Sequence, residues 1–151
     1  MTVHKSCHPF VSTTHVVPPA VVLGMGCRKN KESEAVEKAA FSCLKENDIY
    51  PEAVAALASI DVKKEEPGLL ALSEKLGVPF KTFSSEELLS VQGEFTSSSF
   101  VSKTVGVDNV CERSAVKAAE NHTGIHFIQR KRGAEGVTTA LVLGDWRIRF
   151  E

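Results

Sequence analysis

The stretch Ala20-Val21-Val22-Leu23-Gly24-Met25-Gly26 decides the fold. Its first residues are apolar on both faces, which is typical of a strand buried inside a sheet. The two glycines predict a tight turn after this strand. The apolar residues of the segment 32–45 then recur at helical spacing, with acidic residues near its start. A buried strand, a turn and a helix in this order indicate an α/β fold.

The segments that follow continue the alternation of strand and helix. Residues 53–60 predict a second buried strand, with a helical segment as the alternative because the run contains several alanines. A helix is predicted next, since Pro67 fits a first helical turn and Gly77 fits a left-handed C-terminal cap. Residues 78–83 predict a third strand.

Two more helices are predicted from their N-terminal residues. Ser84 and Glu87 have the spacing of a capping box, which opens a short helix that Gly93 would close. Asp108 is a suitable N-cap for a helix that extends to about Glu120.

The C-terminal end is rich in extended segments. Residues 126–130, 137–143 and 146–150 predict strands, and Gly144-Asp145 fits a two-residue hairpin turn between the last two. Alternating strands and helices early in the chain, followed by a β-rich end, imply a three-layer α/β/α sandwich on a mixed, mainly parallel sheet with a β-rich C-terminal end.

Length and composition limit the class of protein. The 151 residues fit one domain, which we place at 20–151 after a leader or linker at 1–19 that ends in Pro18-Pro19. A net charge of -1 gives no reason to expect nucleic-acid binding. No apolar run is long enough for a membrane span, and the N-terminus lacks the apolar core of a signal peptide. We therefore expect a cytoplasmic protein without membrane contact.

The cysteines and histidines predict neither a disulfide framework nor a metal site. The four cysteines are scattered without a CxxC pair, and we expect reduced thiols, with Cys27 and Cys111 as small buried residues. His122 and His126 have helical spacing, but Gly124 lies between them and predicts a helix end. We expect no resident cofactor.

Candidate ligand-binding groups follow the first strand. Free backbone N–H groups at a helix start favour an anion, and Gly24, Gly26 and Arg28 stand where such a site would form. A dinucleotide-binding turn would need a third glycine where Lys29 stands. The alternative is a packed turn that touches no ligand.

A second group follows the second predicted strand, where clefts of open α/β sheets lie. Lys63 could bind a substrate carboxylate or polarise a carbonyl, and Glu66 could position water as a general base. The alternative is a helix N-cap with a solvated salt bridge. The full set of candidates here is Ser59, Asp61, Lys63 and Glu66.

Further along the chain, Glu112 lies in the first turn of the helix predicted after Asp108, where it could act as a base or orient a cation. The alternative is a charge that only stabilises the helix start. Ser98 and Ser99 could hydrogen-bond a substrate from an exposed loop, although such loops are usually only solvated.

Four patches in order resemble the C-terminal domain of the cobalamin-biosynthesis CbiG proteins and their CobE relatives. Each patch alone is weakly specific, but their order and spacing together span about residues 20–143. The patches are Gly24-Met25-Gly26-Cys27-Arg28; Ala58-Ser59-Ile60-Asp61-Val62-Lys63 with Glu66-Pro67-Gly68-Leu69; Val105-Gly106-Val107 with Val110-Cys111-Glu112 and Ala115; and Lys131 with Thr138-Thr139-Ala140.

The resemblance implies a role in cobalamin biosynthesis. CbiG proteins act on cobalt-precorrin-5A, opening its ring-A lactone with water and losing a two-carbon fragment as acetaldehyde. It follows as an expectation that Lys63, Glu66 and Glu112 are catalytic and that Lys131 and the glycine patch bind substrate. Cobalt would enter only as part of the substrate.

Three functional hypotheses remain open. The chain is the C-terminal domain of a cobalt-precorrin-5A hydrolase and works with an N-terminal CbiG domain or other corrin-pathway enzymes. Alternatively, it is a CobE-like module that binds or carries a corrinoid intermediate without turnover. In the third, it is an oligomerisation domain whose strand 146–150 forms a homodimer edge.

Overall fold

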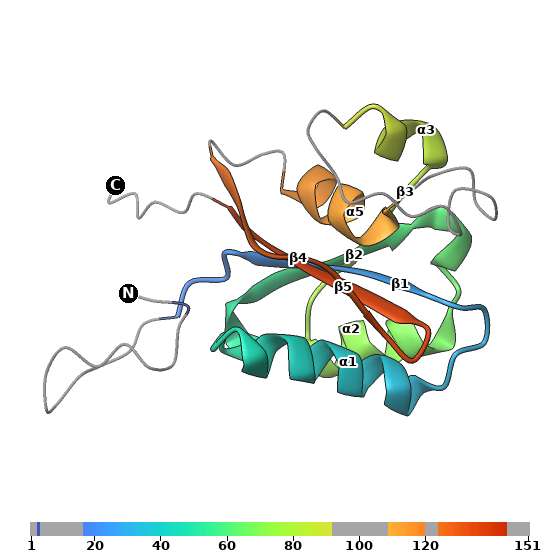
Figure 1. Cartoon of the computed structure of the whole chain (residues 1–151), viewed down its shortest axis with the longest axis horizontal. Helices are drawn as coiled ribbons and strands as arrows, with labels where there is room; N and C mark the ends of the chain where they lie inside the picture. The colour runs from blue at the N-terminus through green and yellow to red at the C-terminus, as the bar shows by residue number, and fades with distance from the viewer. Residues whose placement is uncertain (1–2, 4–16, 92–108, 120–123, 145–151) are drawn as a thin grey trace, which may run out of the picture.

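A computed structural model describes Val3 and residues 17–91, 109–119 and 124–144. Its centre is a five-stranded sheet with the strand order β3-β2-β1-β5-β4 (Figure 1). β1 pairs in parallel with β2, and β2 with β3, whereas β5 runs antiparallel to both β1 and β4. Every strand except β5 therefore points the same way, which confirms the predicted mixed, mainly parallel sheet. The strands are β1 (Val21–Cys27), β2 (Val54–Ile60), β3 (Phe80–Phe83), β4 (Ile125–Ala134) and β5 (Val137–Gly144).

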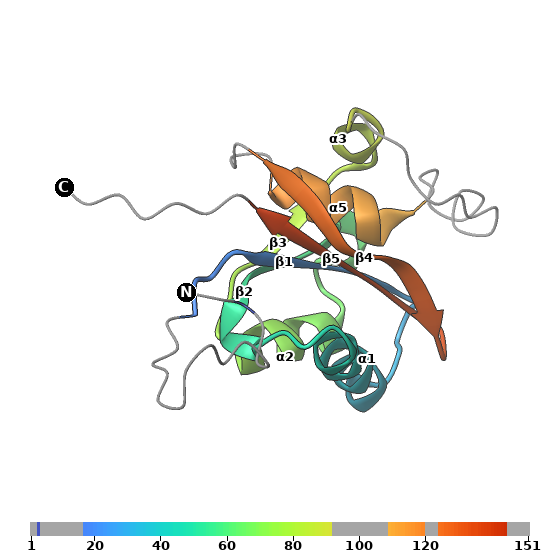
Figure 2. The same cartoon turned by 60° about the vertical axis from the view of Figure 1, so that its left-hand side comes forward.

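Helices cover both faces of this sheet (Figure 2). α1 (Ser33–Glu46) and α2 (Pro67–Leu76) lie on one face. α5 (Val110–Ala118) lies on the other, with α3 (Ser85–Leu89) beside it. The predicted three-layer sandwich is confirmed, and the alanine-rich run 54–60 is a strand rather than a helix.

Local sequence signals explain where α2 and α3 begin and end. Pro67 opens α2, and Gly77 ends it in the left-handed conformation at a φ of 67°. Ser84 caps α3 by accepting from the Glu87 backbone N–H, while the Glu87 carboxylate accepts from the Ser84 N–H at 2.8 Å. Both capping predictions are confirmed, although α3 ends at Leu89, before Gly93.

The predicted glycine turn is wrong, because Gly24 and Gly26 both lie inside β1. A Cβ atom on Gly24 would lie 1.9 Å from the Cys111 carbonyl oxygen, so the glycine allows α5 to pack directly on β1. α1 begins only at Ser33, with Glu32 at its N-cap. The two glycines therefore form no anion-binding helix start.

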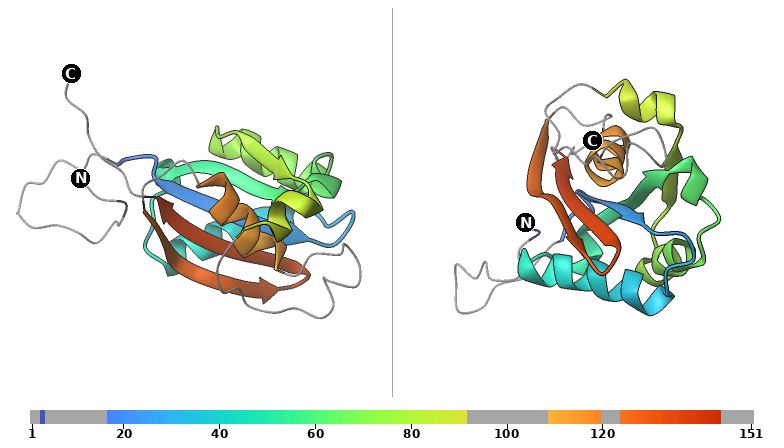
Figure 3. Two further views of the ribbon diagram at one scale, coloured as in Figure 1. Left: turned by 90° about the horizontal axis from the view of Figure 1, so that it is seen from above. Right: turned by 45° about the vertical axis from the view of Figure 1, so that its right-hand side comes forward.

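The start of α5 and the C-terminal hairpin also differ from expectation. Asn109 is the N-cap of α5, whereas Asp108 lies outside the described residues. β4 and β5 form a long hairpin (Figure 3), which turns at Glu135 and Gly136 with φ values of 53° and 80°. Two positive φ angles in a two-residue loop are typical of a type I′ turn. The predicted strand 146–150 lies outside the described residues.

The sheet divides the hydrophobic core in two. Leu23, Met25 and Leu57 pack against α1 and α2, whereas Val22 and Ala58 pack against α5. Val3, within the predicted leader, joins the first core, and its carbonyl accepts from the Tyr50 N–H at 3.1 Å. Within the described ranges, no helix has the length and apolarity needed to cross a membrane.

Candidate functional site

The ends of β1 and β2 bring three polar side chains together at one edge of the sheet. β1 ends at Cys27, and β2 is followed by a short 3₁₀ helix (Asp61–Lys63) and then by α2. Lys63 and Glu66 both lie close enough to Cys27 to change the pKa of its thiol, Lys63 lowering it and Glu66 raising it. Parallel strands end at the same edge, and ligands of open α/β sheets bind there.

Glu66 has unused hydrogen-bonding capacity in this cluster. Its side chain is only 7% exposed, yet none of the described residues donates a hydrogen bond to its Oε1 atom. It occupies the N-cap position of α2 without capping the helix through its side chain. A buried carboxylate oxygen without a donor is costly, by about 1–3 kcal/mol. The Glu66 Oε1 atom can therefore accept a hydrogen bond from water or from a ligand.

Ser59 and Asp61, from the same predicted group, lie at the end of β2 and in the 3₁₀ helix that follows it. The Ser59 side chain is fully buried, and its hydroxyl donates to the Met25 carbonyl at 2.7 Å, which joins β2 to β1. Asp61 is half-buried at the start of the 3₁₀ helix. We expect Ser59 to support the site from within the sheet and Asp61 to lie on its accessible side.

Arg28 lies where β1 leads out of the sheet, beside the turn of the β4–β5 hairpin. Its backbone N–H donates to the Gly136 carbonyl at 3.1 Å. The Arg28 side chain runs along Gly136, so closely that a Cβ atom on Gly136 would lie 3.2 Å from the Arg28 Cδ. The side chain is exposed, so its guanidinium is accessible to an anionic ligand at this edge.

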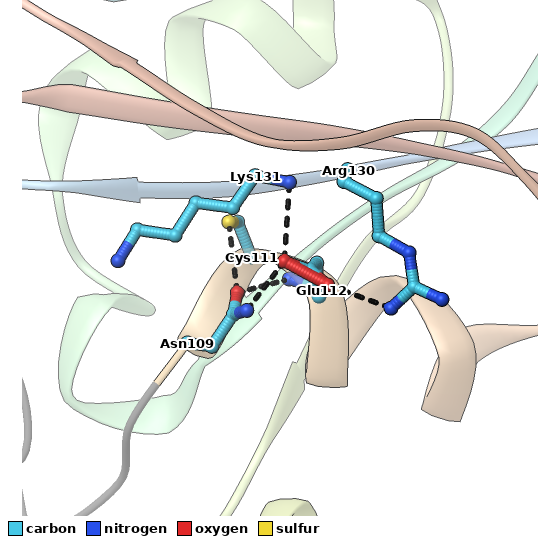
Figure 4. A network of polar contacts seen from close by, with 5 residues as sticks. All are labelled: Asn109, Cys111, Glu112, Arg130 and Lys131. Carbon is cyan, nitrogen blue, oxygen red and sulfur yellow. Dashed lines mark hydrogen bonds and ion pairs between the residues drawn. The ribbon is translucent and has the colours of Figure 1, made fainter. Parts of the chain in front are cut away.

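On the other face of the sheet, Glu112 forms the centre of a second polar cluster (Figure 4). Its side chain is fully buried in the first turn of α5. The carboxylate accepts from the Arg130 Nη1 at 3.2 Å, from the Lys131 backbone N–H at 3.1 Å and from the Asn109 side-chain amide. Glu112 thus connects the start of α5 to β4.

Lys131 brings a cation to the same end of β1. Its side chain extends past Cys111 and away from the Arg130 guanidinium (Figure 4). Burial raises the pKa of the Cys111 thiol to about 12, and the Lys131 charge opposes this rise. Cys111 also contacts Thr138, whose hydroxyl lies against Gly26. The second cluster therefore borders the end of β1 from the α5 face.

The predicted site residues thus divide into two clusters around the end of β1. Lys63 and Glu66 belong to the first, Glu112 and Lys131 to the second, and Gly24 is covered by α5. Ser98 and Ser99 lie outside the described residues. Sequence reasoning missed the contributions of Asn109, Thr138 and Arg130. No group of three or more His, Cys, Asp or Glu side chains that could hold a metal ion occurs in the described ranges.

The proximity of Cys27, Lys63 and Glu66 makes the Cys27 thiol a reporter of the first cluster. Partial burial is the main reason why its pKa is raised. Alkylation requires the thiolate, so in a Cys7→Ser background we expect Cys27 to react more slowly at neutral pH than an exposed thiol. Lys63→Gln removes the charge that lowers this pKa and should shift the alkylation profile to higher pH.

Glu66→Gln removes the charge that raises the Cys27 pKa and should shift the same profile to lower pH. The rate of iodoacetamide labelling against pH measures both shifts. Glu65→Gln, a change at an exposed neighbour, is the control. Identical profiles for the Lys63 and Glu66 variants would contradict the proximity of the three groups.

Comparison with known proteins agrees with the fold. A family model described as "Cobalamin synthesis G C-terminus" matches residues 21–142. The chain belongs to this family. The match begins at β1 and ends within β5, so it contains the described parts of both clusters.

Two curated relatives carry the name cobalt-precorrin-5A hydrolase. The protein of Salmonella typhimurium is 40% identical over 95 residues, which cover 63% of this chain and 27% of that protein. The protein of Priestia megaterium is 30% identical over 128 residues, which cover 85% of this chain and 34% of that protein. The chain therefore spans about a quarter to a third of the length of these hydrolases.

The match to a crystal structure of CobE, a protein from the cobalamin biosynthetic pathway, covers nearly all of that protein. The two structures superpose with a TM-score of 0.75 at 27% identity, covering 85% of this chain and 94% of CobE. The comparison shows that this arrangement of strands and helices makes up nearly all of the CobE chain.

Proposed function

We propose that this domain binds a corrinoid intermediate of cobalamin biosynthesis at the carboxyl end of β1 and takes part in cobalt-precorrin-5A hydrolysis. The observation that carries the proposal is the buried Glu66 carboxylate, whose Oε1 accepts no hydrogen bond from the described residues. Its neighbour Lys63 is a cation on the more accessible side of the same cluster. Membership of the family and the two hydrolase relatives support the substrate class.

The two side chains have complementary roles in lactone opening. Water needs a base that removes a proton as its oxygen attacks the lactone carbonyl, and Glu66 offers an unoccupied carboxylate oxygen for that proton. The carbonyl oxygen gains negative charge during the attack. An ammonium group such as that of Lys63 stabilises this charge. The exposed Arg28 is placed to hold a carboxylate of the ring periphery.

The second candidate function is a binding module without turnover. The match to CobE favours it, because the match covers 94% of that protein. In this case the corrinoid binds to the same edge of the sheet, and the reaction takes place in the rest of a longer hydrolase or in a separate enzyme of the pathway. The N-terminal part of CbiG is the partner that we expect.

One experiment distinguishes these functions. The purified chain is titrated into cobalt-precorrin-5A while the corrinoid absorption spectrum is recorded, and acetaldehyde is assayed with and without the N-terminal part of a hydrolase. Acetaldehyde release by the chain alone establishes the enzymatic role, whereas a spectral change without release by the chain alone establishes the binding role. An unchanged spectrum and no product would refute both. Lys63→Ala should weaken binding about tenfold or more, as expected for the loss of a charge-assisted hydrogen bond.

A further inference from the structure

The pairing of β4 with β5 contains an irregularity at Arg130 and Lys131. Gln129 faces Leu141 and Arg132 faces Thr139, so three residue steps on β4 correspond to two on β5. β4 therefore carries one extra residue there, which is a β-bulge. Neighbouring residues of a regular strand point to opposite faces of the sheet, and a bulge changes this alternation. Bulges occur often beside functional sites because they redirect side chains.

Glu112 is the residue that stabilises this bulge from α5. Its carboxylate accepts the Lys131 backbone N–H at 3.1 Å, a group that a bulge leaves without a partner in the ladder. It also accepts from the Arg130 guanidinium at 3.2 Å, which stacks 4.0 Å from the centre of the Phe127 ring. The two basic residues are thus fixed by one buried carboxylate on the α5 face (Figure 4).

The bulge determines where the Lys131 ammonium lies. The Arg130 guanidinium donates to Glu112, whereas the Lys131 side chain extends in the opposite direction, past Cys111 (Figure 4). The Lys131 side chain lies on the side of Cys111 in Figure 4, and its charge lowers the pKa of the Cys111 thiol. Cys111 and Thr138 connect this position to Gly26 at the end of β1. A ligand over the end of β1 would therefore meet Lys63 on one side and Lys131 on the other.

We propose that Glu112 is a positioning residue: by holding the Arg130–Lys131 bulge, it presents the Lys131 ammonium to a carboxylate of the bound corrinoid. This inference rests on the proposed function. Glu112 acts through Lys131, because the three donors around its carboxylate leave it poorly placed to take a proton from water. It differs in this respect from Glu66, whose Oε1 has no described donor.

The test is a double-mutant cycle on corrinoid binding. The dissociation constant is measured from the absorption change for the wild-type chain, Lys131→Ala, Glu112→Gln and the double variant, at several salt concentrations. We expect Lys131→Ala to weaken binding by about 10- to 100-fold and to reduce its salt dependence. Glu112→Gln should do both to a smaller extent although it removes no cation, and the double variant should bind no more weakly than Lys131→Ala alone.

Arg132→Ala is the matched control. It removes the next cation on the same strand, which pairs with Glu46 of α1, and it should leave affinity and salt dependence unchanged. Lys131→Arg keeps the charge and should restore most of the affinity. If Glu112→Gln fails to fold, the comparison of Lys131→Ala with Arg132→Ala still decides whether Lys131 contacts the ligand.

Three results would overturn the inference. Wild-type affinity in Lys131→Ala would remove Lys131 from the site while leaving the proposed function intact. Additive losses in the double variant would show that Glu112 acts on binding independently of Lys131. The absence of any spectral change with the wild-type chain would overturn the proposed function and this inference together.

Discussion

Replacing Gly24 by alanine should destabilise the fold by about 3 kcal/mol or more, because the added methyl group overpacks the contact between β1 and α5. The Cβ atom would lie 1.9 Å from the Cys111 carbonyl oxygen and 2.8 Å from the Ala115 Cβ. Both are held by helical backbone, which cannot move aside as a flexible side chain can. Either α5 moves off the sheet or the central strand bends. Urea denaturation measures the loss as a lower transition midpoint.

Gly77→Ala is the matched control for the Gly24 prediction. Gly77 has a φ of 67°, and nothing lies within 4 Å of an added Cβ atom. Its replacement adds only backbone strain, of about 1–2 kcal/mol. If Gly24→Ala were no more destabilising than Gly77→Ala, the close packing of α5 on β1 would be refuted. A displaced α5 should also weaken corrinoid binding, since it carries Glu112.

These glycines show why sequence reasoning located the first patch but assigned it the wrong structure. The run from Ala20 to Gly26 predicts both a buried strand and a turn, because glycine favours turns and also permits close approach of another backbone. The choice depends on α5, which follows β1 by more than eighty residues in the sequence. Tertiary packing of this kind leaves no local signal.

Signals that depend on neighbouring residues were more reliable. The start and end of α2 were predicted from Pro67 and Gly77, and the start of α3 from Ser84 and Glu87. Each of these signals acts within one helical turn or at one helix end. The position of Lys63 and Glu66 after β2 could be predicted for the same reason, because both residues follow that strand closely in the sequence. The bulge at Arg130 and Lys131 could not, since it depends on the register between β4 and β5 and on a carboxylate from α5.

Replacing Glu66 by glutamine should reduce acetaldehyde release by about 100- to 10,000-fold, the range expected when a general base is lost. The amide keeps the size of the carboxylate but does not accept a proton from water. Because Glu66 is buried and its Oε1 accepts no hydrogen bond from the described residues, the variant should fold with unchanged or slightly higher stability. The assay uses the chain together with the N-terminal part of a hydrolase, and thermal unfolding is measured in parallel.

Glu65→Gln is the control that separates the base from general loss of charge, because Glu65 is the exposed neighbour of Glu66. It should retain full turnover. If the Glu66 carboxylate were only structural, its replacement would lower the stability of the fold and leave turnover near that of the wild type. Loss of turnover with retained stability and corrinoid affinity is the combination that a catalytic Glu66 requires. An unsatisfied buried carboxylate reduces stability, and the proposed role of Glu66 as a base would explain why the fold retains one at this edge of the sheet.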